Sequence, residues 1–227
     1  MAIFHTVNQR SEAWKKLRLG MPTASRFGDI ITAKGELRTA ETVKKYLCEL
    51  VTERVLRTPV EKWQSHWMER GTNLEPIARA AFAQDNKVEV SEGGFMTTDD
   101  GKFGCSPDGI VAKVVGTNQL EGVEIKVPAP QNHVYYLIYG LGENYVQQVQ
   151  GQMWIGGFDV MNLYSWNPDL PPFHVKTERD EAFIERMAGH LATFHEQVVA
   201  ATLKVKELMT EYREANPQSI LDDVVPF

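Results

Sequence analysis

Residues 105–128, "CSPDGIVAKVVGTNQLEGVEIKVP", contain the segment that decides the fold. Apolar and charged residues alternate in its second half and Pro128 ends the run, which predicts a β-strand. Successive side chains of a strand point to opposite faces, so Glu124 and Lys126 share one face. The opposite face, expected to pack into a core, carries Val123, Ile125 and Val127. A Pro-Asp-Gly turn upstream adds Asp108, so two carboxylates and a lysine come from one predicted hairpin.

These three residues are the groups that metal-dependent phosphodiester hydrolysis uses. Mg²⁺ takes oxygen ligands and usually only one or two protein carboxylates, and a nearby lysine positions the nucleophile or stabilises developing charge. A plain alternative is a surface ion pair on a solvent-facing strand, because Glu-x-Lys alone is a common tripeptide. Asp108 lies 16 residues before Glu124, across the predicted hairpin, and this pairing favours a site.

Helices are predicted on both sides of the hairpin. Residues 9–18 predict a short helix capped by Ser11, and a second helix is expected to open near Thr23 or Ser25. The remaining predicted helices cover 40–57, 61–84 with a break at Gly71 and Pro76 in a first turn, and 143–155. Strands are predicted within 87–115, at 160–166 and at 173–177. This order predicts a mixed α/β, α+β-like fold with helices packed on a central sheet.

The last third of the chain predicts a long helix over 177–215. Apolar residues recur at a spacing of three and four, at 184, 187, 191, 194, 198, 201, 205 and 208. This seam packs either against its own domain or against another subunit. We expect a single domain over 1–215, made of a helical part (1–57), a core (58–176) and the long helix, followed by an acidic tail at 216–227.

Composition limits the class of protein. The 227 residues are 43% hydrophobic, enough for one sizeable core, and no run approaches the roughly 18 apolar residues that cross a bilayer. We therefore expect a cytoplasmic protein that contacts no membrane. Two cysteines, Cys48 and Cys105, are too few for a zinc or iron–sulfur site.

The net charge of −6 is unevenly distributed. Residues 1–57 carry 11 Lys and Arg against 6 Asp and Glu, whereas the rest of the chain carries 13 against 24. Any polyanion should therefore contact mainly the basic N-terminal quarter.

Five segments extend the pattern beyond the hairpin: "WKKLRLGMPTASRFGDII", "ERGTNLEPIARAAF", "GCSPDGIV", "EIKVP" and "YVQQVQGQMW". In this order and spacing they resemble the lambda exonuclease and YqaJ viral recombinase family of the PD-(D/E)XK nuclease superfamily, over roughly residues 12–166. The resemblance implies a restriction-endonuclease-like core and a 5′-to-3′ exonuclease on double-stranded DNA ends that leaves 3′ single-stranded tails for phage-type recombination. It also implies Mg²⁺, with two ions per site and Mn²⁺ able to substitute, a ring-shaped homotrimer, a phage or prophage origin and a single-strand annealing protein as partner.

The same resemblance assigns an active-site role to five residues: Glu75, Asp108, Glu124, Lys126 and Gln148. The three acids would bind metal, the lysine would act beside the attacking water, and the glutamine would complete the catalytic site. Two have a structural alternative. Glu75 precedes Pro76 near an expected helix start, where the helix dipole favours a carboxylate, and Gln148 suits a helix surface. Gln150 points in a different direction on a helix and is not expected to share the role of Gln148.

A second site is expected at "LRLGMPTAS", residues 17–25. A helix opening at Thr23 to Ser25 would point free backbone N–H groups at an anion, and Arg18 would reach across the turn with a planar fork suited to phosphate oxygens. By resemblance, Arg18 and Ser25, with Thr23 beside them, would hold the 5′ phosphate of the degraded strand. The alternative is an ordinary N-cap beside a surface arginine; the position of the motif in the basic quarter favours the phosphate site.

The chain ends in "SILDDVVPF", where the acidic pair Asp222 and Asp223 precedes the terminal Pro226 and Phe227. This resembles the C-terminal tip of bacterial single-stranded-DNA-binding proteins and suggests a tail that binds the annealing protein. The alternative is a disordered or core-docked end.

Two other functions stay open at this point. One is a PD-(D/E)XK endonuclease of restriction or RecB type, and the other is a non-catalytic scaffold that binds DNA ends. The low cysteine count disfavours the iron–sulfur RecB-like branch, and the complete set of acids, lysine and glutamine disfavours the scaffold.

Overall fold

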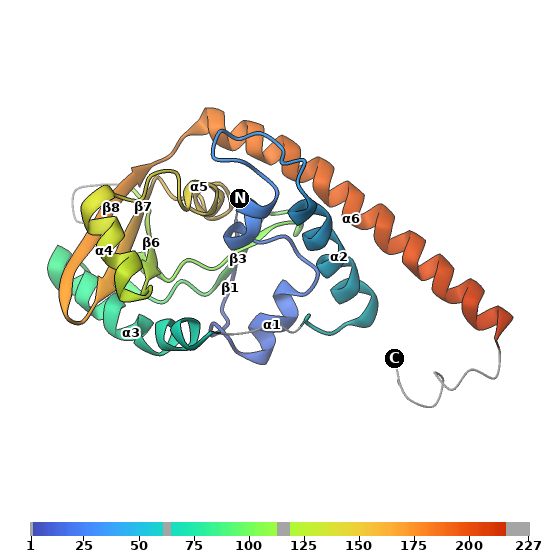
Figure 1. Ribbon diagram of the computed structural model, residues 1–227, viewed down its shortest axis with the longest axis horizontal. Helices are drawn as coiled ribbons and strands as arrows, with labels where there is room; N and C mark the ends of the chain where they lie inside the picture. The colour runs from blue at the N-terminus through green and yellow to red at the C-terminus, as the bar shows by residue number, and fades with distance from the viewer. Residues whose placement is uncertain (1, 61–64, 113–118, 217–227) are drawn as a thin grey trace.

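A mixed five-stranded sheet with the order β2-β5-β6-β7-β8 lies at the centre of the computed structural model, which describes residues 2–60, 65–112 and 119–216 (Figure 1). β6 runs parallel to β7 and antiparallel to β5. The five strands are β2 (Val90–Ser91), β5 (Gly109–Val111), β6 (Glu121–Lys126), β7 (Val160–Asn167) and β8 (Leu170–Glu178). A smaller sheet contains β1 (Ile3–His5), β3 (Phe95–Thr97) and β4 (Gly104–Cys105).

The predicted hairpin is confirmed as β5 and β6, with Gly109 opposite Val123. Its apolar face packs as expected, because Val123, Ile125 and Val127 join one buried cluster with Ala78 and Phe82. Both of these partners lie on α3 (His66–Asn86), so this helix covers the apolar face of β6. The charged face of β6 is turned toward α5 (Val146–Gly156), on the other side of the sheet.

A larger core joins the helices of the two ends of the chain. α2 (Glu41–Leu56) packs on α6 (Glu181–Ala215), with the rings of Tyr46 and Phe194 stacked at 5.9 Å between centroids. α5 packs against the short 3₁₀ helix η1 (Ala24–Asp29), whose Phe27 is fully buried. The remaining helices are α1 (Glu12–Arg18), which Ser11 caps as predicted, and α4 (Pro130–Tyr139).

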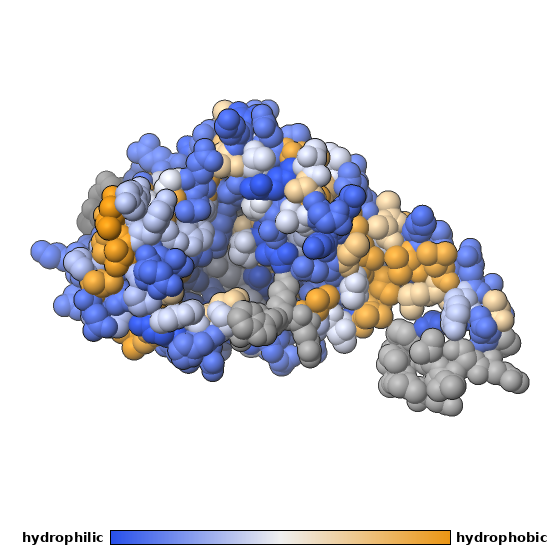
Figure 2. Space-filling model, viewed as in Figure 1, coloured by the Kyte–Doolittle hydropathy of each residue, from blue (hydrophilic) through white to orange (hydrophobic). Residues whose placement is uncertain are grey.

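Only the N-terminal part of the apolar seam of the long helix α6 packs against the rest of the fold. Its buried residues run from Phe183 to Thr202, which confirms packing against its own fold. The C-terminal part projects beyond α2 (Figure 1), and there Leu203, Leu208 and Tyr212 are more than half exposed. Figure 2 shows the apolar surface that results along this projecting part.

Three sequence-based expectations about the helices are wrong. α3 is one continuous helix without a break at Gly71, and Pro76 lies in its interior rather than in a first turn. The burial of Ala78 and Phe82 outweighs the lost hydrogen bond of the proline, and packing is what stabilises most helices in proteins. α6 begins at Glu181 and not at 177, because Asp180 caps it and the preceding residues extend β8.

A helix does open after Thr23 as expected, but it is the six-residue 3₁₀ helix η1. α4, which begins with a proline, lies where no helix is predicted.

The predicted fold class is nevertheless confirmed: a central mixed sheet, flanking helices and a long C-terminal helix. No helix in the described part of the chain is long and apolar enough to span a membrane.

Candidate active site

The charged face of β6 forms the centre of the site. Lys126 Nζ donates to Glu124 Oε1 at 2.6 Å and to Gln148 Oε1 at 3.2 Å. Gln148 Nε2 in turn donates to the same oxygen of Glu124 at 2.6 Å. The Lys126 ammonium also lies 4.6 Å from the ring centre of Tyr145. The structure thus brings together the predicted glutamate, lysine and glutamine in one contact network.

Asp108 joins them from the turn before β5. Its Oδ2 accepts the Ile125 N–H at 2.7 Å, and Arg79 donates to its backbone carbonyl at 2.7 Å. Desolvation raises the pKa of the Asp108 carboxyl well above its ordinary value, and the negative charges of Glu124 and Glu75 raise it further. The site therefore gathers more negative charge than Lys126 alone neutralises.

The pKa of Lys126 also reflects the negative charge of the site. Burial lowers the pKa of this ammonium, but the attraction of Glu124 and Asp108 outweighs that effect, and the net shift is upward. The lysine is consequently held protonated, as a donor and a positive charge.

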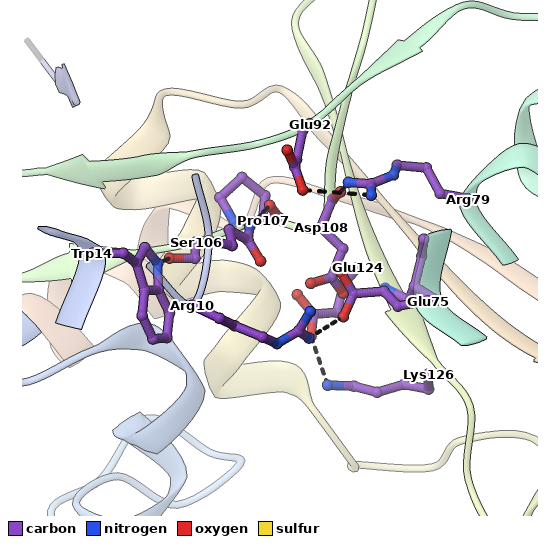
Figure 3. A network of polar contacts seen from close by, with 12 residues as sticks. Arg10, Trp14, Glu75, Arg79, Glu92, Ser106, Pro107, Asp108, Glu124 and Lys126 are labelled. Atoms are coloured by element: carbon purple, nitrogen blue, oxygen red, sulfur yellow. Dashed lines mark hydrogen bonds and ion pairs between the residues drawn. The ribbon is translucent and has the colours of Figure 1, made fainter. Parts of the chain in front are cut away.

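Glu75 reaches the same region from the opposite layer. It is 8% exposed, and its Oε2 forms an ion pair with Arg10 Nη2 (Figure 3). Because α3 is continuous, Glu75 lies well inside the helix, and the expected alternative of a dipole-favoured residue at a helix start is wrong. Arg10 has a left-handed backbone with φ 66°, and the adjacent Gln9 donates to the Pro107 carbonyl at 2.8 Å.

Arg10, Glu75, Lys126 and Tyr145 line an open cleft of about 620 Å³, and the buried Glu124 adjoins it through its contact with Lys126. In the ranges that the structure describes, no three His, Cys, Asp or Glu side chains are placed to hold a metal ion together. The expected set of three acidic metal ligands is therefore not assembled there, and Glu75 forms its ion pair with Arg10 instead. The donor set fits a site with two carboxylates, Asp108 and Glu124, because Mg²⁺ fills its remaining positions with water and phosphate oxygens.

The second predicted cluster also assembles. Arg18 Nη1 and Nη2 lie 3.5 Å from the hydroxyls of Ser106 and Thr23, and Thr23 Oγ1 lies 3.4 Å from Ser25 Oγ. The Arg18 guanidinium stacks over the Trp14 ring at 4.1 Å from its centre. Trp14, Arg18 and Thr23 border a pocket of about 150 Å³.

The Arg18 pocket contains side chains of both charges, because Arg26, Glu49 and Glu53 line it as well. Burial lowers the pKa of the Arg18 guanidinium, which means that the cation is poorly solvated. In residues 2–60, 65–112 and 119–216 Arg18 forms no ion pair; it contacts the Ser106 and Thr23 hydroxyls and the Trp14 ring, and Glu53 attracts it at longer range. The Thr23 N–H is not free to bind an anion, since it donates to Tyr46 Oη at 3.2 Å.

One residue connects the pocket with the cleft. Ser106 Oγ accepts the indole N–H of Trp14 at 2.8 Å and lies near Arg18, and Ser106 stands two positions before Asp108 in the same turn. Figure 3 shows this turn passing from Trp14 to the carboxylates. The two predicted sites are therefore adjacent.

Two polar residues of the site were not predicted. Gln152 Nε2 donates to Glu124 Oε2 at 2.6 Å, and Arg10 pairs with Glu75 as described. The signal for Gln152 is its position four residues after Gln148, on the same helix face. Gln150 is confirmed to point elsewhere, because its amide donates to the Glu178 carbonyl and accepts the Asp180 N–H. The proposed partner-binding residues Asp222, Asp223, Pro226 and Phe227 lie outside the described residues.

Known proteins share this fold. The alkaline exonuclease LHK-Exo from Laribacter hongkongensis is 29% identical, with a TM-score of 0.77, and the match covers 89% of this chain and 100% of that one. The structure of LHK-Exo in complex with dAMP gives 30% identity and a TM-score of 0.78 over the same shares. A phage related exonuclease from Haemophilus somnus 129PT is 14% identical, with a TM-score of 0.60 over 80% of this chain and 96% of that one, which shows the fold alone.

Comparison with curated proteins gives no match. The sequence profile of the YqaJ-like viral recombinase domain matches residues 13–159, which is more than half of the chain. The chain therefore belongs to the YqaJ-like viral recombinase family.

Proposed function

We propose that the protein is a Mg²⁺-dependent exonuclease that degrades double-stranded DNA from 5′-phosphorylated ends in the 5′-to-3′ direction. Family membership supports a nuclease role in recombination. The observation that carries the finer proposal is that Asp108, Glu124 and Lys126 converge next to the cleft lined by Glu75 and beside the Arg18 pocket.

Each cluster has a part in the reaction. Bound Mg²⁺ would lower the pKa of its water and neutralise charge on the scissile phosphate. Asp108 and Glu124 would hold the ion, and protonated Lys126, oriented by Gln148, would donate to the attacking water or to a phosphate oxygen. Arg18, Thr23 and Ser25 would bind the terminal 5′ phosphate with a guanidinium and two hydroxyls.

This arrangement favours stepwise digestion. Every cut creates a new 5′ phosphate, and attraction of that group to the Arg18 pocket would draw the duplex forward by one nucleotide. The product would be a 3′ single-stranded tail, the substrate of a single-strand annealing protein.

The proposal includes two associations. We assign the basic N-terminal quarter to DNA contact within a homotrimer, and the exposed apolar part of α6 is a surface available for subunit contact. Light scattering of the purified protein tests the trimer: a monomer at all concentrations would contradict it.

One experiment tests the activity. End-labelled linear duplex, with a 5′ phosphate or a 5′ hydroxyl, is incubated in Mg²⁺ or in chelator, and a supercoiled circle is included. We expect mononucleotides from the 5′-phosphorylated ends in Mg²⁺ only, with the circle intact. Cutting of the circle would instead indicate the endonuclease, and absence of cleavage on every substrate would indicate the end-binding scaffold.

A further inference from the structure

Glu124 is held at both carboxylate oxygens by two successive turns of α5. Gln148 Nε2 donates to Oε1 and Gln152 Nε2 donates to Oε2, each at 2.6 Å. Lys126 adds a third donor at Oε1. Glu124 is 4% exposed and Gln152 only 1%, so water does not replace either contact.

We propose that Gln152 is a positioning residue that fixes the orientation of the Glu124 carboxylate for metal binding. The inference rests on the proposed function and deepens it, because it concerns the same metal site. The terminal torsion of a glutamate is soft, and a carboxylate bonded at one oxygen still rotates about it. Donors at both oxygens stop that rotation, so the orientation of the carboxylate is set before an ion arrives.

A side-chain amide suits this position because it donates without adding charge. The Gln152 amide lies 2.6 Å from the Glu124 carboxylate, and a second carboxylate at that distance would repel it. A lysine would compete with Lys126 for the same anion. Glutamine supplies the N–H and leaves the charge balance to Lys126 and the ion.

The oxygen of the Gln152 amide indicates that this residue does not serve the stability of the fold. Gln152 Oε1 is buried, and in the described part of the chain it has no hydrogen-bond partner. An unpaired buried acceptor costs free energy, and an apolar side chain of similar volume would avoid that cost. The arrangement is understandable if the donor is what the site requires.

Close packing against η1 fixes the position of α5. Gly151 faces Phe27, and a Cβ at Gly151 would lie 2.6 Å from the ring. A glycine at position 151 therefore lets α5 approach η1 closely, on a helix face next to the one that carries Gln148 and Gln152.

The test compares Gln152→Met with Gln150→Met, a matched control on the same helix. Gln150 is also buried and makes two amide contacts, but both are to the β8–α6 connection. Mg²⁺ binding to the DNA-free protein is measured by calorimetry, kcat and KM are measured on 5′-phosphorylated duplex, and Tm reports folding.

We expect Gln152→Met to weaken Mg²⁺ binding about 10–100-fold and to lower kcat with little change in KM, without lowering Tm. Gln150→Met should lower Tm and leave Mg²⁺ affinity unchanged.

Wild-type Mg²⁺ affinity and kcat in Gln152→Met would overturn the inference and leave the proposed function standing. A Tm of Gln152→Met below that of Gln150→Met, with Mg²⁺ affinity and kcat reduced alike in both variants, would assign Gln152 to fold support and also overturn it. A wild-type protein that neither binds Mg²⁺ nor cleaves DNA would refute the proposed function itself.

Discussion

Asp108→Asn should stabilise the metal-free protein while it removes the nuclease activity. Asparagine keeps an oxygen that accepts the Ile125 N–H, a bond of 2.7 Å in the wild type, and it removes the charge that Glu124 and Glu75 repel. One unit of pKa shift corresponds to about 1.4 kcal/mol, and relief of active-site strain commonly gains about 0.5–2 kcal/mol. For a chain of this size, that gain raises Tm by about 1–8 °C.

The pH dependence has a defined sign. The pKa of Asp108 is raised in the folded state, so the folded protein holds the proton more tightly than the unfolded chain does. This contribution to stability is fully present below the unfolded pKa of about 3.9 and is lost as the pH rises through the folded value. The advantage of Asp108→Asn should therefore be absent near pH 4 and largest at alkaline pH.

Asp100→Asn is the control with the opposite sign. Partial burial would raise the pKa of Asp100, but hydrogen bonds from Thr98 and Lys102 outweigh it and lower the pKa to about 2. The stability that Asp100 contributes is present above its unfolded pKa and is lost as the pH falls toward 2. Asp100→Asn should thus melt below the wild type at pH 8, where Asp108→Asn melts above it.

The same melting experiment, repeated with Mg²⁺, tests whether Asp108 binds the metal. Metal at 100 times its dissociation constant should stabilise the wild type by about 2.7 kcal/mol, and Asp108→Asn should gain much less. Scanning calorimetry from pH 4 to pH 8, with chelator or Mg²⁺, measures both effects. An Asp108→Asn protein that melts at or below the wild type in chelator at pH 8 would refute the electrostatic reasoning, and an equal gain from Mg²⁺ would refute the ligand assignment.

Four further outcomes are expected. Arg18→Ala should slow digestion of 5′-phosphorylated ends about 10–150-fold, because it removes one charged hydrogen-bonding group. End-labelled time courses measure this, and equal slowing on 5′-hydroxyl ends would contradict the phosphate assignment. Lys126→Met should lower single-turnover cleavage about 10²–10⁴-fold with the fold retained by circular dichroism; near wild-type cleavage would exclude a catalytic lysine. Gly151→Ala places a Cβ 2.6 Å from Phe27, which costs about 1–3 kcal/mol in packing and gains about 1 kcal/mol in helix propensity. The free energy of unfolding in urea should therefore fall; a higher free energy of unfolding would show that α5 moves freely. Deletion of residues 222–227 should weaken binding of the annealing protein in a pull-down without slowing cleavage, and unchanged binding would rule out the tail as its docking segment.

The hairpin that carries the site is predictable because its information is local. Alternation over β6 determines which side chains share a face, and Pro128 marks its end. The pairing of Asp108 with this strand follows from the short separation along the chain. α3 is different: Gly71 and Pro76 both indicate a break, yet the helix persists because its apolar residues are buried against β6. In α3, long-range packing contacts, which the sequence does not show directly, outweigh the low helix propensity of glycine and proline.

Arg10 shows a second limit. Its contact with Glu75 joins residues 65 positions apart, and its backbone adopts a left-handed conformation that favours glycine. Neither property follows from residue type, because an arginine beside a helix cap usually faces solvent. The neighbouring Gln9 also contacts this region, because its side-chain amide donates to the carbonyl of Pro107, the residue before Asp108.

The three glutamines of α5 separate what spacing determines from what it leaves open. Helical geometry places Gln148 and Gln152 on one face and Gln150 on another, and the structure agrees. Spacing does not say which face meets a carboxylate; that depends on the depth of α5 against Phe27 and on the charged side of β6. A family resemblance marks Gln148 alone. The contact of Gln152 with the second oxygen of Glu124 becomes visible only in three dimensions, and it shows that two glutamines of one helix face, rather than Gln148 alone, orient this carboxylate.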